Sequence, residues 1–162
     1  MYRVTGKEII EEDRRYPYPC AGATDPIALQ NELKLMLAYR VAEQDWETKF
    51  NGIEQTVSNE NGELWAIIVF PHVVTSLWSA INDEGLSNHP LYSNGLKFYS
   101  VHSVKNSHFE DFFQRDDFPT YHTIFTFKDS TFECVHREEP TLSLYQDYDR
   151  NLLEYLKIQF GS

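Results

Sequence analysis

The sequence predicts an α+β fold, a single domain in which helices pack mainly on one face of a four- or five-stranded antiparallel or mixed sheet. Three observations predict it: apolar residues recur at helical spacing after Pro26, a continuous apolar run occupies residues 64–70, and two alternating segments lie between Tyr121 and Arg137. Each pattern is typical of one kind of element, whose apolar face has to be buried against another.

The first third of the chain is predicted to hold a strand over residues 2–10, a polar loop and then a long helix. Asp25 can cap free backbone amides and Pro26 fits the first helical turn, so this pair predicts the helix start. A helix over residues 26–43 is indicated by apolar side chains three or four positions apart, at Leu29, Leu33, Met36, Leu37 and Val41. Residues 47–57 fit either a continuation of this helix or a strand.

The middle of the chain is predicted to form a strand, a second helix and another strand. The run at residues 64–70 is rich in branched side chains, which suits a central strand covered on both faces. Pro71 then predicts a helix that Gly85 would end, and the apolar stripe of this helix would comprise Val73, Val74, Leu77, Trp78 and Ile81. A further strand is predicted over residues 97–104.

The C-terminal half begins with a capping box, in which Ser107 is followed three residues later by Glu110, and this predicts a short helix over residues 108–114. Residues 121–128 and 131–138 then alternate around a two-residue turn, which predicts an antiparallel hairpin. In that register Phe125 would face Cys134 on the core side, and the opposite face would be more polar and partly exposed. A last helix is predicted over residues 143–159, and residues 1–162 form one domain.

The charge of the chain restricts its partners. Among the 162 residues, 25 are acidic and 14 are basic, for a formal charge of -11. Such a charge repels phosphate backbones and anionic lipid headgroups, so nucleic acids and membranes are disfavoured and a basic protein partner is favoured. The longest apolar run is too short to cross a bilayer, and Cys20 and Cys134 are too few for a disulfide framework. The cytoplasm is therefore the expected compartment.

No arrangement of chemically reactive side chains stands out. The six histidines lack the spacing of a metal motif, and no glycine-rich phosphate loop is present. Cys134 lies two residues before His136, but an apolar neighbourhood favours a core thiol over a nucleophile. The sequence therefore predicts no catalytic residue, no metal site and no cofactor, and it favours a protein that is not an enzyme.

The aromatic residues in and beside the predicted loops suggest a contact surface, although they also fit the simpler role of fixing loops to the domain. We expect a non-enzymatic protein-binding or regulatory module, such as an assembly factor or an immunity-type inhibitor, in which a few aromatics supply most of the affinity. The candidate contact residues are Tyr16, Tyr18, Phe112, Phe113 and Phe118, with Asp116 and Asp117 as charges at the rim.

Two alternatives remain open. The first is a small-ligand-binding or enzymatic α+β domain with an aromatic pocket between sheet and helices, in which His122, Glu133 or His136 supplies the polar group. The second is a homodimer that forms through an exposed edge of the hairpin.

Overall fold

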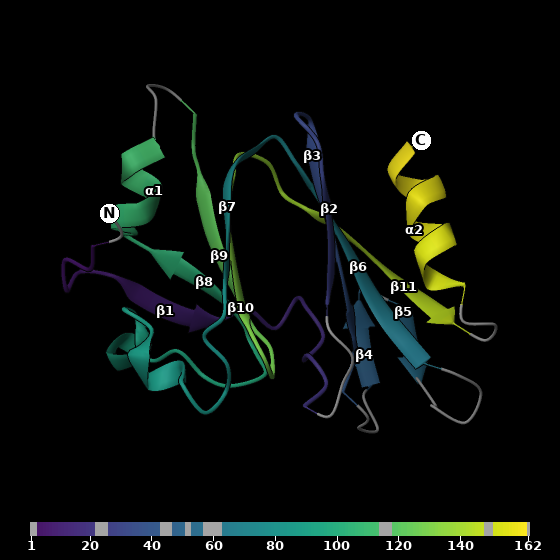
Figure 1. Ribbon diagram of the computed structural model, residues 1–162, viewed down its shortest axis with the longest axis horizontal. Coiled ribbons are helices and arrows are strands. Elements are labelled where there is room, and N and C mark those ends of the chain that lie inside the picture. The colour runs from purple at the N-terminus through teal and green to yellow at the C-terminus, as the bar shows by residue number, and fades with distance from the viewer. Residues whose placement is uncertain are drawn as a thin grey trace.

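The fold is mostly β, so the α+β prediction is wrong. The computed structural model describes residues 3–21, 26–42, 47–50, 53–56, 63–113, 118–147 and 151–161. Within them, two antiparallel sheets pack face to face, and the two α-helices are short and peripheral (Figure 1). Neither helix is long and apolar enough to span a membrane, in the part of the chain that is described.

The larger sheet has five strands, with β10 and β9 near its centre and β1 and β7 at its edges. In spatial order its strands are β1 (Ile9–Glu12), β8 (Val101–Lys105), β9 (Tyr121–Thr126), β10 (Thr131–His136) and β7 (Val73–Ser79). Its outer face is covered by α1 (His108–Phe113) and by a segment containing two short 3-10 helices, η2 (Leu86–Asn88) and η3 (Tyr92–Asn94).

The smaller sheet has four strands, with β11 and β2 at its edges. In spatial order they are β11 (Thr141–Asp147), β6 (Glu63–Pro71), β3 (Lys34–Arg40) and β2 (Ile27–Gln30). The helix α2 (Leu152–Gly161) packs on its outer face through Leu152 and Leu156. A separate hairpin is formed by β4 (Glu47–Phe50) and β5 (Ile53–Thr56).

The chain passes from one sheet to the other three times, from β1 to β2, from β6 to β7 and from β10 to β11. His72 alone separates β6 from β7, with a positive φ of 49°, and residues 137–140 join β10 to β11. The β6–β7 and β10–β11 crossings lie at the same end of the molecule, at the top of the view in Figure 1. The turn between β9 and β10 lies at the opposite end of β10.

The main core lies between the sheets and is centred on Phe125. Its ring lies within 5.9 to 6.2 Å, centre to centre, of the aromatic rings of Tyr16, Tyr39, Phe70, Phe127 and Phe132. All of these residues are buried, and aliphatic side chains from β3 and β6 complete the cluster. The sandwich therefore depends on aromatic packing between the two sheets.

The first predicted helix, over residues 26–43, is instead the β2–β3 hairpin. Asn31 makes the turn, because its side-chain oxygen accepts hydrogen bonds of 2.9 Å from the backbone amides of both Leu33 and Lys34. Residues 35–39 are buried on both faces of β3. A continuous apolar run contains helical spacings by coincidence, and this is why the pattern was misleading.

The other two long helices were also wrong for physical reasons. Residues 73–79 form the strand β7, where Val73, Val74 and Thr75 are β-branched and favour extended backbone. Residues 141–147 pair with residues 63–69 of β6, and among the described residues of the predicted C-terminal helix only those from Leu152 onward are helical. The strand predicted at residues 64–70 is confirmed as part of β6, with partners on both sides.

The predicted hairpin and its core face are confirmed, but its register differs by two residues. Phe125 pairs with Phe132, and residues 127–130 form the connection, with the Phe127 amide donating to the Ser130 carbonyl at 2.9 Å. A shift of two keeps every side chain on the predicted face. The opposite face is not partly exposed as expected, because the 3-10 segment and α1 bury it. The short helix predicted at residues 108–114 is confirmed as α1.

Candidate functional site

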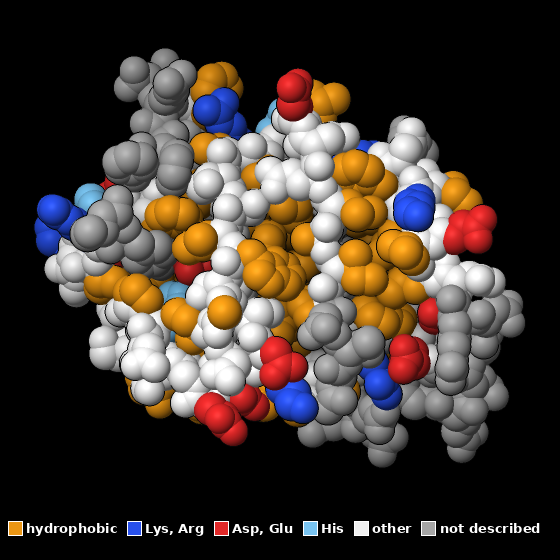
Figure 2. Space-filling view, viewed as in Figure 1, with side chains coloured by type: hydrophobic (Ala, Val, Ile, Leu, Met, Phe, Trp, Pro, Cys, Tyr) orange, Lys and Arg blue, Asp and Glu red, His pale blue; other side chains and the backbone are white. Residues whose placement is uncertain are grey.

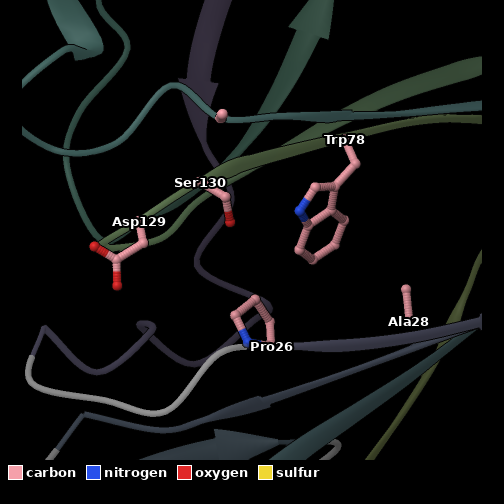
Figure 3. Close-up of a pocket in the computed structure, with 6 residues that line it drawn as sticks. Pro26, Ala28, Trp78, Asp129 and Ser130 are labelled. Atoms are coloured by element: carbon pink, nitrogen blue, oxygen red, sulfur yellow. The ribbon is translucent and has the colours of Figure 1, made fainter.

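An open cleft of about 490 Å³ lies at the end of the sandwich opposite the β6–β7 and β10–β11 crossings. It is bounded by the edge strand of each sheet and by the turn between β9 and β10 (Figure 3). The residues that line it are Pro26, Ala28, Trp78, Ala80, Asp129 and Ser130. Its size is within the range of about 300 to 1,000 Å³ typical of ligand sites.

The cleft exists because a large side chain on one sheet faces small ones on the other. Trp78 extends from β7 toward Ala28 and Pro26, whose side chains are too short to fill the gap (Figure 3). Further along the two edges the gap is bridged, since the Ser76 hydroxyl donates a 2.8 Å hydrogen bond to Gln30 Oε1. The cleft is therefore closed at one end by this bond and open at the end near Asp129.

Trp78 presents a fixed aromatic surface to the cleft. Its ring is stacked at 6.2 Å from Phe127, with an interplanar angle of 22°, and lies 5.1 Å from Phe132. These two buried rings support the indole, yet the residue remains 44% exposed. In the view of Figure 2, hydrophobic side chains are gathered in the middle of the molecule. An exposed tryptophan held by packing is the kind of residue that supplies binding energy at low entropic cost.

The open end of the cleft is acidic. Asp129 is exposed in the turn, and the backbone amide of Asp83 donates a 2.8 Å hydrogen bond to the carbonyl of the adjacent Lys128. The Tyr99 hydroxyl donates to Asp83, and this bond, with partial burial and the negative charge of both aspartates, raises the pKa of Tyr99 to about 12. The Tyr99 hydrogen bond and the exposed Lys128 lower the pKa of Asp83, and against the single positive charge of Lys128 the two carboxylates leave a net negative charge that favours a cation.

The β7 strand leaves one of its edges unpaired within the described part of the chain. It pairs with β10 along its length and has no strand on its other side. None of its seven residues is charged, and Leu77 and Trp78 are both exposed. Charged residues and proline are the usual protection of such edges, and β7 has neither.

The contact residues predicted from the sequence do not line this cleft where the structure describes them. Tyr16 is buried against Phe125, and the Tyr18 hydroxyl donates to Glu12, so both fix their loop to the domain. Phe118 is 61% exposed, with the Arg137 guanidinium 5.6 Å from its ring. The side chains of Phe112 and Phe113 lie outside the described atoms, as do the residues Asp116 and Asp117.

A second polar cluster is buried on the outer face of the larger sheet. Glu133 accepts hydrogen bonds from His89 Nε2 at 3.0 Å and from His122 Nε2 at 2.9 Å. His122 Nδ1 lies 2.7 Å from the Ser107 hydroxyl, which also accepts the Glu110 amide at 3.1 Å as the cap of α1. The network thus ties the 3-10 segment and α1 to β9 and β10.

This network is arranged for stability rather than for chemistry on a ligand. The Leu91 amide donates to His89 Nδ1 at 3.1 Å, so the proton of His89 lies on Nε2, facing Glu133. At His122 the Ser107 hydroxyl, which accepts the capping amide of α1, has its own proton to donate to Nδ1, so Nε2–H again faces Glu133. Burial alone would raise the pKa of Glu133, but the hydrogen bonds from His122 and His89 outweigh it and hold the pKa at about 2. All four polar side chains are buried and engaged, and none of them lines the cleft.

The remaining candidates for chemistry are likewise inside the protein. His136 Nε2 lies 3.0 Å from the Thr123 hydroxyl and its Nδ1 is 2.8 Å from the Glu138 carbonyl. Burial raises the pKa of the Cys134 thiol, which favours the inert form. Among the described residues, no group of three or more His, Cys, Asp or Glu side chains is placed to hold a metal ion.

Sequence reasoning missed the cleft because it assigned Ala28 and Trp78 to helices. The available signal was the run of β-branched residues at 73–75, two positions after Pro71, which is typical of a strand. No family model matches the chain, and no curated protein or solved structure matches it either. The geometry of the site therefore carries the functional argument alone.

Proposed function

We propose that this chain is a non-enzymatic binding module that captures a basic protein partner at the cleft between β7 and β2. The observation that carries the proposal is Trp78, an indole fixed by two buried rings yet 44% exposed beside an unpaired strand edge. A buried partner side chain against such an anchor supplies much of the affinity of a protein interface.

The charge supports a basic partner. The chain carries a formal charge of -11, and Asp83 and Asp129 lie at the open end of the cleft. Opposite charges speed association and fix orientation, while the apolar contacts slow dissociation. A regulator, an assembly factor or an inhibitor would act in this way, and the unpaired cysteines suit the reducing cytoplasm.

A second candidate is favoured by the cleft volume of about 490 Å³, which suits a small molecule. In that case the ligand would have an apolar body against Trp78 and a cationic group toward Asp129. A small ligand needs no strand edge, so the exposed length of β7 favours the protein partner.

A photoreactive amino acid in place of Leu77 would crosslink the partner and so identify it. Binding of that partner to this chain would then be measured with both proteins purified. We expect one-to-one binding that Trp78→Ala weakens at least tenfold, because the anchor is lost. Phe118→Ala is the matched control, since it removes an exposed aromatic side chain that does not line the cleft. Binding that depends on Phe118 and not on Trp78 would refute the cleft as the site.

A further variant, Ala28→Leu, separates the small-ligand alternative. The probe is an apolar fluorescent cation. Its binding to the wild type and its exclusion by Ala28→Leu, which fills the cleft, would favour the small-molecule ligand if no purified protein partner competes with the probe. Competition by a partner protein for the same probe would support the proposed function.

A further inference from the structure

Resting on the proposed function, we infer how the partner binds: an extended segment adds a strand to β7, places an apolar side chain in the cleft against Trp78, and places a lysine or arginine two residues away beside Asp129. The partner is thus defined as a strand with an apolar residue and a basic residue on one face. This inference names the occupant of the cleft and its backbone geometry.

The backbone of β7 supplies the first argument. Its pairing with β10 runs from Val73 to Ser79, with one register irregularity near His136. Because alternate residues of a strand direct their amide and carbonyl groups to opposite sides, the unpaired side of β7 presents a row of donors and acceptors. An extended peptide satisfies such a row with main-chain hydrogen bonds, and the pockets beside it select side chains.

The side chains of β7 supply the second argument. Trp78 pairs with Phe132 and points into the sandwich, whereas Leu77 pairs with Glu133 and points to the outer face, where it is 39% exposed. An added strand alternates in the same way, so one partner residue contacts Trp78 and its neighbour covers Leu77. Both exposed apolar side chains of the edge are then buried by one segment.

The charge at the open end of the cleft determines where the basic residue of the partner strand lies. Residues two apart on a strand are separated by about 7 Å along one face. That step leads from Trp78 to Ala80, the first residue after β7, which lines the cleft together with Asp129. A basic side chain at this position meets Asp129 and the nearby Asp83, so the motif has its basic residue two positions from the apolar one.

A second copy of this chain does not fit the same edge. Two copies would each carry a formal charge of -11 and would repel each other. The β7 strand itself contains no lysine or arginine that would meet the Asp129 of another copy. The occupant is therefore a different protein.

The test uses fluorescein-labelled nine-residue peptides on a threonine-rich background, with leucine at the centre and lysine two positions away in either direction. Anisotropy with the full-length protein measures binding. We expect lysine→glutamate or leucine→serine in the peptide to weaken binding at least tenfold. N-methylation of the amides on one edge of the peptide should weaken it equally, while N-methylation of the other edge leaves it unchanged, because a single edge pairs with β7.

Variants of the protein separate the possible results. Ala28→Leu fills the cleft and should abolish binding, whereas Ala28→Ser leaves the cleft open and should bind as the wild type does. If both N-methylated sets bind equally well while Trp78→Ala and Ala28→Leu still abolish binding, the strand geometry is wrong and the proposed function stands. If the peptides bind Trp78→Ala and Ala28→Leu normally, the cleft is not the site and both proposals fail.

Two further outcomes overturn the inference alone. One is that no peptide of the set binds, although the crosslinked partner depends on Trp78. The other is a dimer of the free protein by light scattering that Leu77→Lys dissociates, because the occupant of the edge is then a second copy.

Discussion

Replacement of Glu133 by glutamine tests the buried network that fixes the outer layer of the larger sheet. Glutamine resembles the protonated carboxyl group in shape. Its NH₂ group would face one of the two imidazole nitrogens, and because that nitrogen is itself a donor, one hydrogen bond is lost. Since each pKa unit corresponds to about 1.4 kcal/mol, the fall from 4.5 to about 2 is equivalent to about 3 kcal/mol. We expect Glu133→Gln to lower the free energy of unfolding by this amount at pH 7.

The same substitution has a defined pH dependence. The folded-state pKa of Glu133 lies below its ordinary value, so its stabilisation is complete above pH 4.5 and is lost as the pH falls toward 2. The difference between wild type and variant should therefore shrink from about 3 kcal/mol at pH 7 to about 1 kcal/mol at pH 3. Groups that titrate alike in both proteins cancel in this difference.

Urea unfolding followed by circular dichroism between pH 7 and pH 3 measures the effect. Glu32→Gln is the matched control, because Glu32 is exposed, and we expect it to remain within about 0.5 kcal/mol of the wild type. A difference for Glu133→Gln that is constant with pH, or close to zero at pH 7, would refute the charged network.

Three more perturbations test the fold. Phe125→Ala should lower the free energy of unfolding by about 3 to 5 kcal/mol in urea titrations, because it leaves a cavity among five aromatic rings. Ser107→Ala should cost about 1 to 2 kcal/mol in the same assay, since α1 loses its cap and His122 its partner. A thiol reagent at pH 8 should modify Cys20 in the native protein and Cys134 only after unfolding, because Cys134 is buried.

Controls make these results decisive. Phe98→Ala and Ser93→Ala remove exposed side chains of the same types and should change stability by less than about 1 kcal/mol. A Phe125→Ala variant as stable as Phe98→Ala would contradict the aromatic core, and equal costs for the two serine variants would contradict the cap. Rapid native modification of Cys134 would show that the space between the sheets is open to solvent.

Local signals in the sequence predicted the elements that local physics determines. The capping box at Ser107 identified α1, and strict alternation identified the β9–β10 hairpin and its core face. The register differed by two because the alternation fixes the face of each side chain and leaves the length of the turn open. Asp129 and Ser130 therefore lie in a four-residue connection.

Long-range pairing decided the rest of the fold and could not be predicted in the same way. Residues 35–39 and 64–68 are buried on both faces, and a run of this kind has no period that separates a helix from a strand. The residues of β11 become a strand because they pair along β6. Because the residues of β2 and β7 were assigned to helices, the cleft between these strands could not be predicted from the sequence.

Hydrogen exchange of the β7 amides, with and without the peptide that carries leucine and lysine, tests the proposed binding mode most directly. We predict that peptide at saturation slows exchange at least tenfold at the alternate amides of Val73–Ser79 that face away from β10, because the added strand accepts their hydrogen bonds. The edge strands β1 and β11 serve as internal controls and should not change. Slower exchange confined to β1 or β11, or unchanged exchange throughout β7, would contradict strand addition at this edge.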